Sequence, residues 1–65
     1  MIREILNGEF MDYRNVHEKC SGLTRSEIRY QKMMEGIKTL SVTNKDGETI
    51  WLWYDPQDIW EKYSA

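Results

Sequence analysis

The stretch from Leu23 to Gly36 constrains this chain most, because it carries both the start and the stop signal of one helix. Thr24 can cap the helix by accepting the backbone N–H of Glu27, whose carboxylate can reach back to the Thr24 N–H in a capping box. Leu23 and Ile28 have the spacing of a hydrophobic staple around that cap. Gly36 suits the left-handed backbone that ends many helices. The sequence therefore predicts a helix over residues 24–36.

At about 100° per residue, the side chains of this helix fall on three sides. The side predicted to pack against the rest of the domain consists of Tyr30, Met33, Met34 and Ile37. A second side consists of Glu27, Gln31 and Glu35. The third side is a cationic stripe of Arg25, Arg29 and Lys32. A helix that enters a DNA major groove needs one apolar side and one side rich in donors, although a purely solvated helix face shows the same stripe.

A second helix is predicted before this one. Apolar residues of segment 2–20 recur at helical spacing, and the turn-forming pair Asn7-Gly8 interrupts them. We predict a short turn or strand at 2–6 and a helix from about Phe10 to Cys20. The pair Ser21-Gly22 is a tight turn, so the two helices would form a helix-turn-helix unit. A plain helical hairpin uses the same parts.

After Gly36 the pattern alternates, as in strands, with a hairpin loop at residues 44–47. The side chains predicted to face the core are Leu40, Val42, Ile50, Leu52 and Tyr54. Trp51 and Trp53 would then face outward. Two interpretations stay open: a C-terminal helix folds back over these indoles, or they form a protein-docking surface with Trp60 and Tyr63.

The acidic residues near the end of the chain suit helix capping better than catalysis. Asp55 can cap a last helix that starts at Pro56, and Asp58 suits the positive end of its dipole. His17 and Cys20 have no second ligand pair for a zinc site. Without a nucleophile–base pair, phosphate loop or metal cluster, we expect no enzyme and no metal or small-molecule cofactor.

Charge is distributed unevenly along the 65 residues, which we predict to form a single domain. The net charge is −2, yet residues 14–45 carry seven Lys and Arg against three Glu, a balance of +4. Cys20 is the sole cysteine, and the longest apolar run, Ile50–Tyr54, is far shorter than the ~20 residues that span a membrane. We therefore expect a cytoplasmic protein that does not enter a membrane.

From Gly22 onward the chain resembles the small winged-helix DNA-binding domains of the excisionase and MerR type. The matching segments are Gly22–Ile28, Met34–Ile37, the ribbon that closes on Trp51 and Trp53, and Tyr54–Ile59. The resemblance implies an α+β winged helix-turn-helix in which helix 24–36 enters the major groove and the ribbon is a wing. By position, it implies DNA contacts from Arg25, Ser26, Arg29 and Lys32, with Lys45 on the wing.

Two functions follow as hypotheses. The first is a sequence-specific DNA-binding protein of a phage or mobile element, a transcription regulator or recombination accessory factor whose partner is double-stranded DNA. The second is a small acidic inhibitor or adaptor that binds a host protein through the Trp51/Trp53 face. Self-association into a homodimer is compatible with either function.

Overall fold

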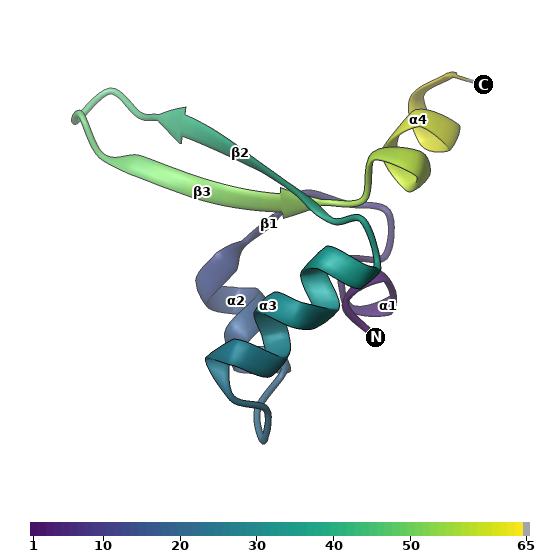
Figure 1. The fold of residues 1–65 in the computed structure, drawn as a ribbon. Helices are drawn as coiled ribbons and strands as arrows, with labels where there is room; N and C mark the ends of the chain where they lie inside the picture. Colours follow the sequence, from purple (N-terminus) through teal and green to yellow (C-terminus); the bar gives the residue numbers. More distant parts are fainter. Residues whose placement is uncertain (65) are drawn as a thin grey trace.

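The computed structural model describes residues 1–64 as four helices and a three-stranded antiparallel sheet, a small α+β arrangement. In chain order the elements are α1 (Ile2–Leu6), β1 (Met11–Asp12), α2 (Tyr13–Lys19), α3 (Arg25–Met34), β2 (Lys38–Thr43), β3 (Thr49–Tyr54) and α4 (Pro56–Ser64). Figure 1 shows α1, α2 and α3 on one side of the sheet, while the β2–β3 hairpin extends beyond them. No helix within residues 1–64 is long and apolar enough to cross a membrane.

The sheet has the order β1-β3-β2, so β3 is its central strand. β1 pairs Met11 with Trp53 and Asp12 with Leu52. The predicted helix from Phe10 to Cys20 is therefore wrong at its start, since α2 begins only at Tyr13, after Asp12 accepts the backbone N–H of Arg14 at 2.8 Å. A two-residue strand forms only by pairing with a segment about 40 residues further along the chain. The periodicity of neighbouring residues carries no information about such a distant partner.

Seven side chains form the buried core: Ile2, Leu6, Val16, Cys20, Ile28, Ile37 and Trp53. They come from α1, α2, α3 and β3, with Cys20 directly after α2 and Ile37 directly before β2. Burial raises the pKa of the Cys20 thiol, which keeps it protonated as expected for a packed cysteine. Segment 2–6, predicted as a turn or strand, is a helix anchored by its two buried ends.

The predicted caps of α3 are confirmed. The backbone N–H of Glu27 donates to Thr24 Oγ1 at 3.2 Å, and the Thr24 N–H donates to Glu27 Oε1 at 3.3 Å. Gly36 follows the helix at a φ of 70°. Of the predicted apolar side only Ile37 is buried, at 4% exposed. The prediction is wrong for Tyr30, Met33 and Met34, which are 55%, 68% and 63% exposed.

The inner side of α3 instead combines Ile28 with two charged residues that have specific partners. The Lys32 ammonium lies 5.4 Å from the centre of the Trp53 ring. The Glu35 carboxylate accepts the backbone N–H groups of Ile2 and Arg3 at 3.0 and 2.9 Å, which caps α1. Burial opposes ionisation of Glu35, but these hydrogen bonds outweigh it and hold its pKa below the usual range.

The faces of the hairpin are opposite to those predicted. Trp53 is 9% exposed and turns toward the helices, whereas Leu40, Val42 and Ile50 are 44%, 42% and 37% exposed on the other face. Both faces of the ribbon carry large apolar residues, so alternation alone cannot choose between them. The indole of Trp53 has more apolar area to bury than the aliphatic side chains do.

α4 starts as predicted, with Asp55 as its cap and Pro56 as its first residue. Asp55 Oδ1 accepts the Gln57 N–H at 2.9 Å, and its Oδ2 pairs with Arg3 Nε, so this carboxylate is only 2% exposed. The helix does not fold back over the tryptophans, which corrects that interpretation. Figure 1 shows α4 leaving the end of β3 away from α2 and α3.

Candidate functional site

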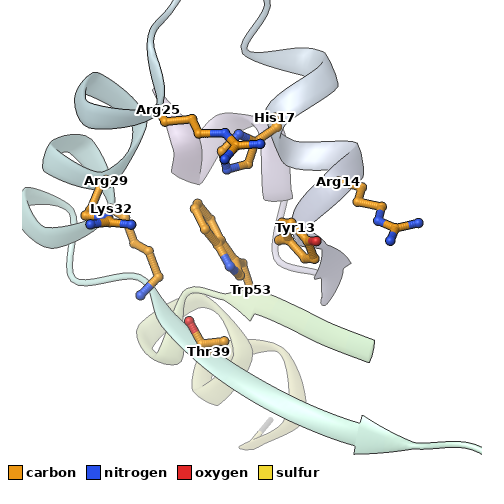
Figure 2. A pocket seen from close by; sticks show the side chains of 8 residues that line it. All are labelled: Tyr13, Arg14, His17, Arg25, Arg29, Lys32, Thr39 and Trp53. Carbon is orange, nitrogen blue, oxygen red and sulfur yellow. The ribbon is translucent and has the colours of Figure 1, made fainter. Parts of the chain in front are cut away.

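An open pocket of about 760 Å³ lies between α2, α3 and the face of the hairpin that turns toward them. We call it the cationic pocket. Its lining residues, drawn in Figure 2, are Tyr13, Arg14 and His17 of α2, Arg25, Arg29 and Lys32 of α3, Thr39 of β2 and Trp53 of β3. The core fixes the elements that supply it, because α2 and α3 bury Val16 and Ile28, and Trp53 of the pocket itself belongs to the core.

Aromatic rings form the floor of the cationic pocket. The His17 ring lies edge-on to Trp53, with ring centres 5.7 Å apart at 68°. Tyr13 stands edge-on to His17 at 6.0 Å and 88°. These contacts hold the imidazole between two rings and leave the Lys32 ammonium over the indole, so the floor has a defined shape before any ligand binds.

Four cations surround that floor, namely Arg14, Arg25, Arg29 and Lys32. No carboxylate lines the pocket, and within residues 1–64 these four make none of the ion pairs, which lie elsewhere. In Figure 2 the α3 cations reach in from one side, and Arg14 stands on the opposite side of Trp53. Like charges gathered in a pocket whose described lining holds no carboxylate create a positive potential that favours an anion.

The structure brings together three of the five side chains predicted for DNA contact. Arg25, Arg29 and Lys32 share the cationic pocket, whereas Ser26 lines a different, more apolar hollow with Leu23 and Tyr30. Lys45 lies in the hairpin loop, some six residues beyond Thr39, which corresponds to about 20 Å of strand.

The hairpin loop that carries Lys45 is held by its own hydrogen bonds. Asn44 Oδ1 accepts the backbone N–H groups of Asp46 and Glu48, both at 2.9 Å, and Gly47 adopts the predicted positive φ of 82°. Such a loop presents Lys45 at the far end of a rigid ribbon rather than on a loose segment.

The α2 side of the pocket was missed from the sequence. Arg14 and His17 are three residues apart and therefore share one face of α2, a spacing that could have indicated them. The four residues predicted for a protein interface are not equivalent: Trp51, Trp60 and Tyr63 are 49%, 72% and 66% exposed. Trp53 is only 9% exposed, belongs to the core and lines the cationic pocket, so it does not share an outer surface with the other three.

The arrangement suits binding of an extended anion, since guanidinium groups on two helices can each donate two hydrogen bonds to a phosphate. In comparisons with known proteins, no family, curated protein or solved structure matches this chain.

Proposed function

We propose that this chain is a winged-helix protein that binds double-stranded DNA in a sequence-specific manner, as a transcription regulator or recombination accessory factor of a phage or mobile element. In this proposal α2 and α3 are the helix-turn-helix, the β2–β3 hairpin is the wing, and α3 enters the major groove. The order of the elements supports it, because the hairpin follows α3 directly and β1 joins the same sheet.

The cationic pocket is the observation that carries the proposal. A chain of net charge −2 collects four cations from two helices on one concave surface without a lining carboxylate. Such an arrangement raises the energy of the unbound protein, and a phosphate backbone relieves it. Apart from Trp51, the hairpin face beside the pocket is polar, with Ser41 opposite Trp51 and the pair Thr43 and Thr49 further along, which suits a surface that follows a DNA backbone.

Roles can be assigned within the proposed complex. Arg25 and Arg29 lie on the exposed side of α3 and would donate to base edges or phosphates, and Ser26 in the first turn would add a further contact. Arg14 of α2 and Lys32 of α3 would each bind a phosphate of the DNA backbone. Lys45 would reach the adjacent backbone from the tip of the wing.

Reversing two of these charges tests the proposal. The double substitution Arg25→Glu plus Arg29→Glu should weaken binding to duplex DNA by about 100-fold or more at low salt, because it removes two phosphate contacts and adds repulsion. Binding is measured by fluorescence anisotropy with a labelled duplex, and folding by far-UV circular dichroism. Both side chains are exposed and lack ion pairs within residues 1–64, so the fold should persist.

A matched control separates this site from overall charge. Lys19→Glu plus Lys62→Glu changes the net charge equally, but Lys19 ends α2 and Lys62 lies on α4, and neither lines the cationic pocket. Lys62 gives up only an exposed ion pair with Glu9. This variant should lose less than about tenfold, as expected for long-range screening alone. Equal losses in the two variants would refute a dedicated site on α3.

A further inference from the structure

The face of the hairpin that turns away from α2 and α3 is apolar and uncovered. The register pairs Leu40 with Leu52 and Val42 with Ile50, and all four side chains lie on the face opposite Trp53. Leu40, Val42 and Ile50 are each more than a third exposed. Figure 1 shows α1, α2 and α3 on the other side of the sheet, so within residues 1–64 nothing covers this cluster along the hairpin.

α4 leaves the sheet on this same uncovered side (Figure 1). None of its residues is buried, and Trp60 and Tyr63 are 72% and 66% exposed. A helix of nine residues is marginal in water without a packing surface. The rings of Tyr54 and Phe10 lie 5.1 Å apart, so an aromatic pair stands at the end of β3 from which α4 departs. We call Leu40, Val42, Ile50, Leu52, Trp60 and Tyr63 together the outer apolar face.

We propose that a second copy of this chain docks on the outer apolar face and forms a two-fold symmetric dimer. In such a dimer the same patch meets itself, so it must be complementary to itself. The four hairpin residues carry no charge, so two copies meet there without the like-charge repulsion that the cationic pocket would impose.

The apolar area of the outer apolar face is large enough for a dimer interface. Two exposed aromatic and several half-exposed aliphatic side chains present several hundred Å² of apolar surface, on the order of the ~800 Å² that each partner buries in a standard interface. A core of seven buried side chains is small for an independent domain, and chains of this length commonly gain stability by self-association.

The two proposals can fail independently. The sheet separates the outer apolar face from the cationic pocket, so a dimer formed there leaves both pockets accessible. Dimerisation therefore does not depend on DNA binding, and loss of either property leaves the other measurable.

Sedimentation equilibrium between about 1 and 500 μM tests the dimer, with 7.8 kDa as the mass of the monomer. We expect twice that mass at the upper concentrations. The variant Val42→Lys plus Ile50→Glu places an opposite-charge pair across the strands of the outer apolar face and keeps the net charge. It should weaken dimerisation by at least about 100-fold, since it buries charges in the interface.

The control is Thr43→Lys plus Thr49→Glu, a cross-strand pair on the other face of the same hairpin, and it should dimerise like the parent chain. If the Val42/Ile50 variant loses its circular dichroism signal, Trp60→Ala plus Tyr63→Ala decides instead, because both side chains are largely exposed and their loss should spare the fold. That variant should weaken dimerisation at least about tenfold. A parent chain that stays at 7.8 kDa throughout, or folded variants that dimerise as tightly as the parent, would overturn the proposal.

Discussion

Replacing Trp53 with alanine should remove a large part of the free energy of unfolding. The indole is 9% exposed, belongs to the core, and contacts the His17 ring and the Lys32 ammonium. Truncating a buried tryptophan costs about 3–5 kcal/mol, whereas a 65-residue domain has a total stability of roughly 3–10 kcal/mol. The measurement is urea unfolding followed by far-UV circular dichroism, which does not depend on tryptophan emission.

Trp51→Ala is the matched control, because Trp51 lies two residues earlier on the same face of β3 and is 49% exposed. It should cost under about 1 kcal/mol. Equal losses at the two positions would mean that the helices do not pack on the Trp53 side of the hairpin.

Asp55→Ala should destabilise the fold by about 2–3 kcal/mol. The carboxylate is 2% exposed, caps α4 through the Gln57 N–H, and pairs with Arg3 Nε. Loss of an N-cap costs about 1 kcal/mol, and a broken buried ion pair costs more. Because the Arg3 side chain is 47% exposed, water can hydrate it after the change, which keeps the total below that of a fully buried pair.

Two further variants separate the contribution of the helix cap from that of the ion pair with Arg3. Asp55→Asn keeps a capping oxygen but removes the charge, so it should cost about 1–2 kcal/mol. Asp12→Ala removes the cap of α2, which has no such ion pair within residues 1–64, and should cost only about 1 kcal/mol. Chemical denaturation gives all three values. A cost for Asp55→Ala no larger than that for Asp12→Ala would show that the Arg3 contact adds no stability.

Signals that act over a few residues predicted the structure well. The capping box at Thr24, the glycine after α3, the hairpin loop and the start of α4 all depend on side chains within about four residues of the backbone groups they satisfy. The sequence also predicted that Arg25, Arg29 and Lys32 share one side of a helix, and they do line one pocket.

Which side chains are buried, and which elements meet at the pocket, could not be predicted where these features depend on segments distant in sequence. The inner side of α3 holds Lys32 and Glu35 because the ring of Trp53 and the N-terminus of α1 are there to receive them, and both partners are remote in sequence. The exposed methionines of α3 and the exposed aliphatic face of the hairpin follow from the same long-range packing. Arg14 and His17 joined the site only because α2 lies across the pocket from α3.

The most direct test of DNA binding by the cationic pocket is the salt dependence of the parent chain's affinity for a random-sequence duplex. Each neutralised phosphate contributes about −0.9 to the slope of log K against log salt concentration, so the four pocket cations predict a slope of about −3 to −4. The Arg25→Glu plus Arg29→Glu variant should reduce the steepness by about 2. Absence of binding at about 50 mM salt, or an unchanged slope in that variant, would contradict the assignment of this surface to DNA.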